Sequence, residues 1–379
     1  MEHVARKTIV CVVGTRPEAI KMAPVIQALH EAPWARCRVL LTGQHREMLD
    51  QALMFFGIEP HVDLDVMRLK LPLDRLAAYL VKTLSSTLAS EQPDMVLAQG
   101  DTTTVVATAI AAFLQNLPFG HVEAGLRTQC LFAPFPEEAN RVVASHLSAL
   151  HFAPTISART NLEREGISPR TIFVTGNTVI DALALTAERD LPVGIDLDPA
   201  KRLILVTAHR RESFGEPMRQ ICRAVAELHE RYSDIEFLWP VHPNPAIEPI
   251  VEAMLSRRPR VRLVPPLDYG PFVSALKRST LVLTDSGGIQ EEAPALGKPV
   301  LVLRAESERP EAIASGVARL VGHDPGAIVA EVSRLLDDSA AYGAMAKGTS
   351  PYGDGQAARR IVSGVASFLR VADTMRIAG

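Results

Sequence analysis

Short apolar runs alternate with amphipathic helical patterns along the chain, and this alternation constrains the fold more than any other feature. Residues 8–13 are apolar on both faces of a predicted strand, and 22–29 follow with apolar residues at the i, i+3, i+4, i+7 spacing of a helix. Strands that lack an alternating polar face are buried on both sides. The pattern therefore predicts an α/β protein whose parallel sheets are covered by helices on both faces.

The alternation occurs in two series separated by a pause. Further strands are predicted at 38–41, 95–98, 119–122 and 172–175 in the first series, and at 203–207, 235–239, 261–263, 281–284 and 300–303 in the second. The intervening segment 189–200 contains two prolines and several acids but no sustained apolar period, so we interpret it as a linker. We predict a doubly wound Rossmann-like domain at 1–188, completed by a C-terminal helix at 356–379, and a second at 201–355. The active site is expected in the cleft between them.

Composition excludes several classes of protein. The 379 residues carry a net charge of −3, which argues against a nucleic-acid-binding protein. The longest apolar run, about 105–114, is shorter than the roughly 20 residues of a membrane helix. The apolar stretch 9–13 is too short for a signal peptide. Because the four cysteines are scattered, neither a metal site nor a disulfide framework is expected. We expect a cytoplasmic protein without membrane insertion.

Charged side chains follow several predicted strands, at the sheet edge where open α/β sheets bind ligands. The candidates for acid–base chemistry are Asp101, Glu123, Glu137 and His209, and the first predicted helix carries the cations Arg16 and Lys21. Several of them have a simpler structural explanation: an acid in a first helical turn, such as Glu137, is favoured by the helix dipole, His209 fits a satisfied core or loop histidine, and Arg16 and Lys21 fit a solvated helix face. The gathering of four titratable groups at strand ends favours function.

Residues 286–288 (Ser-Gly-Gly) precede a helix predicted at about 289–296 and closed by Gly297. Small residues before a helix let backbone N–H groups approach a phosphate, although a plain tight turn would have the same composition. Glu292, one turn into this helix, could accept sugar hydroxyls. Residues 353–358 fit GxGxxA, but no strand precedes them, so we reject a dinucleotide site there. No cofactor is expected.

A series of longer motifs carries a family resemblance. In chain order they are GTRPEAIKMAPVI, TGQHREML, QGDTTT, HVEAGLRT, PFPEEANR, VTGNTVID, VTAHRRESFG, PVHPNP, DSGGIQEEAPALGKPVL, ERPEAI and PYGDGQAARRIV. From about Ile9 to Ile361 the chain resembles the non-hydrolysing UDP-N-acetylglucosamine 2-epimerases. The resemblance implies a GT-B glycosyltransferase-like fold, a homodimer and an isomerase that supplies a precursor of surface polysaccharide.

The resemblance also implies a reaction and its residues. UDP-N-acetylglucosamine and UDP-N-acetylmannosamine interconvert by anti elimination of UDP to 2-acetamidoglucal, followed by re-addition. The catalytic positions of the family are matched by Asp101, Glu123, Glu137 and His209. Its UDP-binding positions are matched by Arg16, Lys21, Leu267, Phe272, Ser286, Gly287, Gly288, Glu292 and Arg309, with Phe272 beside the uracil and Leu267 contacting through its backbone. Gln44 and His45 match the region where some members hold a second, activating UDP-N-acetylglucosamine.

One segment departs from the family pattern. Where the family often reads RDxTERPE, this chain reads RAESERPE, with Ala305 and Ser307 at the Asp and Thr positions. A modified UDP-sugar is therefore a second candidate substrate. The motifs also leave open a hydrolysing relative that releases UDP and N-acetylmannosamine, a GT-B glycosyltransferase, and an inactive sugar-nucleotide sensor.

Overall fold

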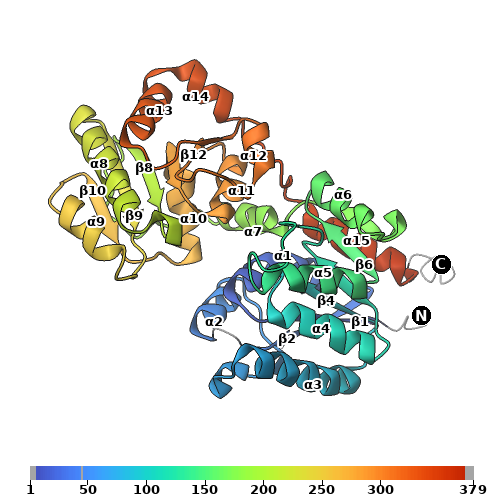
Figure 1. Cartoon of the computed structure of the whole chain (residues 1–379). Helices are drawn as coiled ribbons and strands as arrows, with labels where there is room; N and C mark the ends of the chain where they lie inside the picture. Colours follow the sequence, from blue (N-terminus) through green and yellow to red (C-terminus); the bar gives the residue numbers. More distant parts are fainter. Residues whose placement is uncertain (1–5, 44–45, 372–379) are drawn as a thin grey trace. The chain divides into compact units, whose positions relative to one another are not determined.

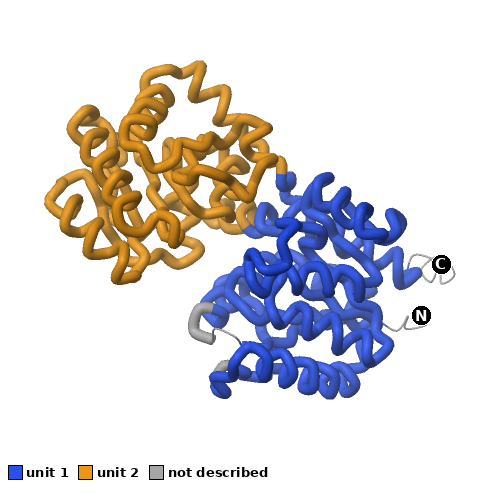
Figure 2. The backbone as a smooth tube through the Cα atoms, in the orientation of Figure 1, with its two compact units in different colours: residues 1–182, 352–379 blue, residues 183–351 orange. Residues whose placement is uncertain are grey.

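The computed structural model describes residues 6–43 and 46–371. The chain divides into two compact units, residues 1–182 with 352–379 (unit 1) and residues 183–351 (unit 2) (Figure 2). The predicted linker 189–200 lies within unit 2. There the Asp198 N–H donates to Glu236 Oε2 at 2.9 Å, and Arg278 Nη2 donates to the Asp198 carbonyl at 2.5 Å.

Within the described residues, unit 1 contains a seven-stranded parallel sheet in the order β3-β2-β1-β4-β5-β6-β7 (Figure 1). The strands are β1 (Lys7–Val13), β2 (Ala35–Leu41), β3 (Val62–Asp63), β4 (Met95–Gln99), β5 (Phe119–Val122), β6 (Leu150–Ala153) and β7 (Ile172–Val174). The helices are α1 (Arg16–Glu31), α2 (Arg46–Phe55), α3 (Leu73–Glu91), α4 (Thr103–Leu114), α5 (Glu137–Leu147), α6 (Ile156–Arg164), α7 (Thr178–Ala187), which crosses the boundary between the units, and α15 (Ala357–Phe368). The strand order reverses between β1 and β4, and ligands bind at such a switch point.

Unit 2 repeats this architecture with a six-stranded parallel sheet, ordered β10-β9-β8-β11-β12-β13 among the described residues. Its strands are β8 (Arg202–Thr207), β9 (Ile235–Pro240), β10 (Val261–Val264), β11 (Leu281–Thr284), β12 (Val300–Val302) and β13 (Ala318–Leu320). Its helices are α8 (Glu216–Arg231), α9 (Glu248–Leu255), α10 (Tyr269–Arg278), α11 (Gly287–Ala295), α12 (Pro310–Ala314), α13 (Pro325–Asp337) and α14 (Ser339–Met345). The switch point of this sheet lies between β8 and β11.

Each sheet is buried on both faces, as the apolar runs predict. Val10 and Val12 of β1 pack with Val96 of β4 and Leu84 of α3 in the core of unit 1. In unit 2, Trp239 lies fully buried in β9 and belongs to a core cluster that includes residues of α8, α9 and α13. No helix in the described part of the chain is long and apolar enough to cross a membrane.

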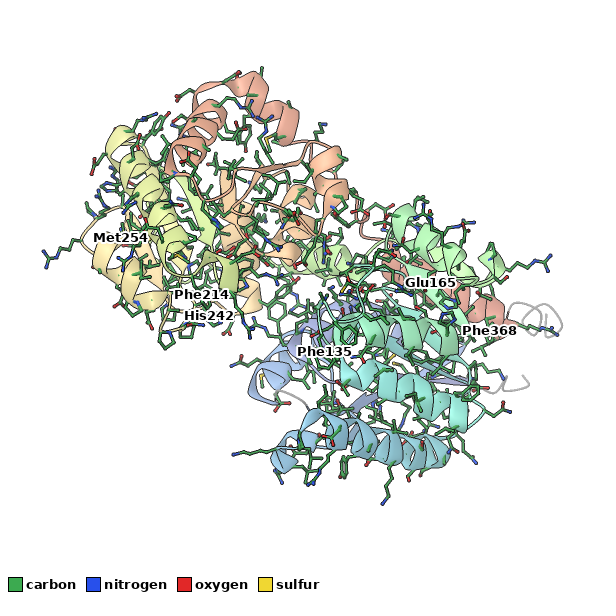
Figure 3. All side chains as sticks on the ribbon, viewed as in Figure 1. Phe135, Glu165, Phe214, His242, Met254 and Phe368 are labelled. Carbon is green, nitrogen blue, oxygen red and sulfur yellow. The ribbon has the colours of Figure 1, made fainter. Side chains whose placement is uncertain are left out.

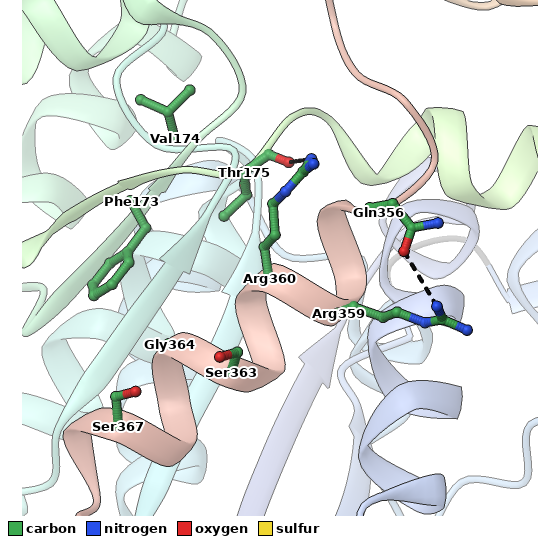
Figure 4. Close-up of a pocket in the computed structure, with 9 residues that line it drawn as sticks. All are labelled: Phe173, Val174, Thr175, Gln356, Arg359, Arg360, Ser363, Gly364 and Ser367. Carbon is green, nitrogen blue, oxygen red and sulfur yellow. Dashed lines mark hydrogen bonds between the residues drawn. The ribbon is translucent and has the colours of Figure 1, made fainter.

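Helix α15 belongs to unit 1 although it follows unit 2 in sequence. Asp181 accepts hydrogen bonds from the Ala357 and Ala358 N–H groups at 3.2 and 2.8 Å, and Arg360 donates to the Thr175 carbonyl at 3.0 Å. Figure 4 shows α15 against β7, where the two elements line a cavity of about 530 Å³. These contacts hold the end of the described chain against the first sheet.

Gly125 positions the loop that follows β5. Its φ is +90°, and a Cβ atom there would lie 2.3 Å from the Ala158 carbonyl oxygen of α6. A side chain at this position therefore meets both left-handed backbone strain and a backbone clash that no rotamer relieves. Gly166 has a similar φ of +85°, but nothing lies within 4 Å of its Cβ position.

These two glycines give a matched test. We expect Gly125→Ala to lower the free energy of unfolding by at least about 2 kcal/mol more than Gly166→Ala, because both substitutions incur the φ strain and only the first incurs the clash. Urea unfolding of the two variants and the unsubstituted protein measures this difference. Equal losses would show that α6 moves away without cost.

Candidate functional site

Glu123 follows β5 and is held by partners from three other segments of unit 1. Lys21 of α1 donates to both of its carboxylate oxygens, at 2.9 and 2.7 Å, Asn177 donates to Oε1 at 3.3 Å, and Gln99 of β4 donates to Oε2. The side chain is 6% exposed, and the residue has a φ of +64°. A non-glycine residue in the left-handed region persists only where its surroundings hold it, and such residues cluster at functional sites. The structure thus brings together Lys21 and Glu123, both predicted from the sequence.

Asp101 lies just beyond β4 and is fixed by α5. Arg141 donates to Asp101 Oδ2 through Nε at 2.9 Å and Nη2 at 2.6 Å, and Asn140 donates to the Asp101 carbonyl at 2.8 Å. Burial alone lowers the pKa of Arg141, but the facing carboxylates of Asp101 and Glu138 outweigh it and raise that pKa. These bonds hold the Asp101 side chain and backbone in one orientation.

Glu138 connects this ion pair to the preceding loop. Its Oε2 accepts from Arg141 at 2.9 Å, and its Oε1 accepts from the N–H groups of Thr128 and Gln129 at 2.8 and 3.2 Å. The loop that it anchors carries Phe135, which is 62% exposed (Figure 3). The acid next to the candidate Glu137 is therefore a buried structural clamp.

Glu137 is the first residue of α5, as predicted, and differs from its neighbour. Its Oε2 atom is buried and has no hydrogen-bond partner among the described residues. A buried carboxyl oxygen without a partner is costly, and such groups gather at sites where a ligand completes the bonding. Glu137 therefore differs from Glu138, whose two carboxylate oxygens are both paired.

A second buried acid, Glu18, joins two loops at the switch point of unit 1. Its carboxylate accepts from the N–H groups of Gly14 and Thr15 at 2.5 and 2.9 Å, and from the Thr102 hydroxyl at 2.5 Å. Burial raises its pKa to about 7, and the nearby negative charge of Asp101 adds to the effect. Glu18 thereby links the loop after β1 to the loop that carries Asp101.

In unit 2, α11 begins at Gly287, two residues earlier than predicted, with Ser286 as its N-cap. Glycine has a poor helix propensity, which is why the local pattern favours a later start. The Gly287 Cβ position lies 3.7 Å from the Arg309 guanidinium and 3.8 Å from Arg210 Nη2. Free N–H groups of a first helical turn beside two guanidinium groups form an anion site suited to a diphosphate.

Arg309 and Ser307 are oriented by α11 itself. Arg309 Nε pairs with Glu291, and the Arg309 N–H donates to Ser307 Oγ at 2.9 Å. Ser307 Oγ in turn donates to Gln290 Oε1 at 2.5 Å. The Ser that departs from the family pattern therefore still joins this loop to the helix.

His209 follows β8, and Asp285 follows β11 beside it. Asp285 Oδ2 accepts from the N–H groups of His209 and Arg210, both at 2.8 Å. The His209 ring stacks on His242 with 5.9 Å between centroids (the position of His242 is labelled in Figure 3). Burial lowers the pKa of His209 most, Arg210 and His242 lower it further, and Asp285 raises it.

The remaining predicted residues have simpler surroundings. Arg16 is the first residue of α1 and is half-buried, Glu292 is 9% exposed in α11, Phe272 is half-buried in α10, and Leu267 is half-buried in the preceding loop. Gln44 and His45 lie outside the described residues. In the described part of the chain, no three His, Cys, Asp or Glu side chains form a group that could hold a metal ion.

Comparison with known proteins identifies the family. A sequence model described as UDP-N-acetylglucosamine 2-epimerase matches residues 27–366. The UDP-N-acetylglucosamine 2-epimerase of Escherichia coli K12 is 49% identical over 366 residues, covering 93% of this chain and 97% of the relative.

The chain belongs to the UDP-N-acetylglucosamine 2-epimerase family.

Solved structures agree with this family and its fold. The UDP-GlcNAc 2-epimerase from Neisseria meningitidis, solved with UDP-GlcNAc bound, has a TM-score of 0.86 and 43% identity, covering 95% of this chain and 100% of that one. The glycosyltransferase SnogD from Streptomyces nogalater has a TM-score of 0.60 at 17% identity, covering 94% and 99%, which is a likeness of fold alone. The predicted fold class, two doubly wound domains of the GT-B glycosyltransferase type, is confirmed.

Sequence reasoning passed over several residues of this epimerase-family site. Arg141, Glu138, Arg210 and Asp285 all lie inside the motifs that carried the resemblance; Glu138, Arg210 and Asp285 are each next to a residue that was predicted, and Arg141 lies four positions after Glu137. A charged residue adjacent to a candidate catalytic group was the available signal. The sequence did not show the contacts that matter: Arg141 bonds to Asp101, 40 positions away, and Asp285 accepts from the His209 and Arg210 N–H groups, 76 and 75 positions away.

The raised pKa of Glu18 predicts that the free energy of unfolding depends on pH. Because its pKa is about 7 in the folded protein and near 4.5 in an unfolded chain, the folded state binds more protons between these values. The contribution of Glu18 to the free energy of unfolding therefore falls as pH rises through this window. In the unsubstituted protein, Glu18 should lower the free energy of unfolding by on the order of 2 kcal/mol between pH 5 and pH 7.5. We expect this decrease to be absent in Glu18→Gln, as measured by urea unfolding at the two pH values.

The exposed Glu188 supplies the control. Glu188→Gln should keep the pH dependence of the unsubstituted protein. A Glu18→Gln variant that kept it too would contradict the assignment of the slope to Glu18.

Proposed function

We propose that this chain reversibly epimerises UDP-N-acetylglucosamine at C2, giving UDP-N-acetylmannosamine. The observation that carries the proposal is membership of the epimerase family along nearly the whole chain, with all four acid–base side chains of the family motifs present. The bound UDP-GlcNAc of the N. meningitidis relative supports the substrate. The product would serve as a precursor of surface polysaccharide.

The proposed reaction divides into an elimination and an addition. A base removes the C2 proton, the C1–O bond breaks, and its electrons leave with UDP while the C2–H pair forms the C1=C2 bond of 2-acetamidoglucal. C2 then takes a proton on the opposite face, and UDP adds back to C1. Inversion at C2 requires proton transfer on both faces, which one carboxylate cannot provide from a single position.

In unit 1 we assign these proton transfers to Asp101, Glu123 and Glu137. Asp101 is paired with the Arg141 guanidinium and would accept the C2 proton, and Glu137 Oε2 is a buried oxygen without a hydrogen-bond partner among the described residues. Glu123 accepts hydrogen bonds from Lys21 at both carboxylate oxygens, which hold the side chain in place.

In unit 2 we assign UDP binding and departure of the leaving group. The first turn of α11 at Ser286, Gly287 and Gly288, with Arg309 beside it, would hold the diphosphate. His209 would donate a proton or a hydrogen bond to the departing oxygen. Arg16 and Lys21 of unit 1 would add positive charge, Glu292 would accept sugar hydroxyls, and Phe272 and Leu267 would contact the uracil.

Exchange of the C2 hydrogen tests the proposal directly. Incubation with UDP-N-acetylglucosamine in D₂O, followed by NMR, should give UDP-N-acetylmannosamine with deuterium at C2. Free UDP with N-acetylmannosamine would favour a hydrolysing epimerase. Exchange only with another UDP-sugar would favour a modified substrate, and no exchange with any would favour a transferase or a sensor.

Asp101→Asn tests the role of the carboxylate. We expect the exchange rate to fall by about 10²–10⁴-fold, because the amide cannot accept the C2 proton, while UDP affinity by calorimetry stays within about threefold. Asp74→Asn, at an exposed aspartate of α3, should leave both unchanged. Exchange retained in Asp101→Asn would remove this residue from the catalytic set.

We also propose that the chain forms a homodimer through α4. Val106, Ile110, Phe113 and Leu114 share one face of this helix, and the last two are 64% and 61% exposed. A contiguous apolar helix face of this kind is typical of an interface between subunits. The homodimer implied by the family resemblance supplies a second copy as its occupant.

Phe113→Glu should convert the protein from the mass of two chains to that of one, measured by light scattering, because it places a charge in the interface. Ile156→Glu is the control, since Ile156 is 67% exposed on α6. A dimer that persists in Phe113→Glu would place the interface elsewhere.

We further propose that a second UDP-N-acetylglucosamine binds near Gln44 and His45 and activates the enzyme. This part is supported by the family resemblance of the TGQHREML motif.

A further inference from the structure

Asp285 is a buried carboxylate at the switch point of unit 2. The proposed reaction assigns it no role. It follows β11 directly and is 0% exposed. Its Oδ2 accepts three hydrogen bonds of 2.8 Å, from the His209 and Arg210 N–H groups and from Ser213 Oγ. All three donors belong to the loop that follows β8.

The other carboxylate oxygen of Asp285, Oδ1, accepts none of these hydrogen bonds. Oδ1 is buried and has no hydrogen-bond partner among the described residues, and it lies 3.6 Å from Nδ1 of His209. Leaving a buried carboxylate oxygen unpaired costs free energy that a purely structural clamp would not require. The oxygen faces the ring nitrogen from just beyond hydrogen-bond distance, and such contacts tighten when substrate binds.

We propose that Asp285 is a positioning residue for His209. This inference rests on the proposed function. In it, Oδ1 accepts a hydrogen bond from the Nδ1–H group of His209, so that Nε2 faces the departing diphosphate. The His209 imidazolium then transfers its Nε2 proton to the UDP oxygen as the C1–O bond breaks, and recovers it on re-addition. The Nδ1 proton stays on His209 and remains hydrogen-bonded to Asp285 Oδ1 throughout.

The charges around His209 make this role necessary. Arg210 lies next to it in the chain, and the ring of His242 stacks on it, so both neighbours oppose its positive form. Asp285 is the negative group that faces it. Without that carboxylate, His209 would be neutral over more of the pH range and would lose the proton that it is to donate.

Asp285→Asn tests the charge while keeping the clamp. The amide oxygen can accept all three bonds of Oδ2, and the amide NH₂ then faces Nδ1, where it cannot accept a proton. We expect the epimerisation rate to fall about a hundredfold or more, with UDP affinity within about threefold. The alkaline limb of the pH–rate profile should move to lower pH by about one unit.

Ser213→Ala is the matched control, because it removes one donor to Oδ2 and leaves Oδ1 untouched. Its pH–rate profile should keep the limb of the unsubstituted enzyme. If both variants slow the reaction equally and neither moves the limb, Asp285 is only structural and the proposal is overturned. If Asp285→Asn keeps both rate and limb, it is overturned as well.

A measurement on the unsubstituted chain does not depend on the folding of any variant. Nitrogen-15 NMR of the UDP-bound protein, with the His209 ring assigned by its loss in His209→Gln, should show the proton on Nδ1. A proton on Nε2 alone would overturn the proposal. Absence of C2 exchange in the unsubstituted protein would instead overturn the proposed function, so the two failures are distinguishable.

Discussion

Every strand in the described sheets pairs in parallel, and parallel neighbours can be joined only by a connection that returns along the sheet, usually a helix. As a result, all the strands of a sheet end at the same edge, and each loop that leaves this edge begins a helix. In unit 1 this rule brings the residues after β1, β4 and β5 together, and in unit 2 it does the same for β8 and β11. The candidate residues are neighbours because of strand pairing, although more than a hundred residues separate Lys21 from Glu123 in the chain.

The acids gathered in this way differ in their surroundings. Asp101 faces a guanidinium, Glu123 is held by a lysine and two amides, and Glu137 has a buried oxygen without a described partner. Glu18 is buried among backbone N–H donors with its pKa raised to about 7. The carboxyl groups of a single unit therefore differ in their bonding, because the loops and helices around each one supply different partners.

The fold was largely predictable from local patterns. The errors in the predicted strands and helices have physical causes. Strands such as β1 and β8 were found because their residues are apolar on both faces. Strand β6 was missed because His151 interrupts its apolar run, and this ring is accommodated by the Ser145 carbonyl on α5 and by Thr171 before β7. The start of α11 was placed too late because Gly287 and Gly288 are poor helix formers, whereas in the folded chain the Gln290 side chain donates to the Ser286 carbonyl across the first turn.

The sequence by itself determined the fold class, the family and the identity of the chemical groups, because periodicity and motifs are local properties of the chain. Only the tertiary structure decided which of two adjacent acids is a clamp, which cation faces which carboxylate, and that Asp285 turns one oxygen toward His209. The cation–carboxylate pairs and the Asp285–His209 contact join residues 40 to 102 positions apart, and Glu138 reaches back 10 positions to the Thr128 N–H. They depend on helix packing and strand order, so no local pattern contains them.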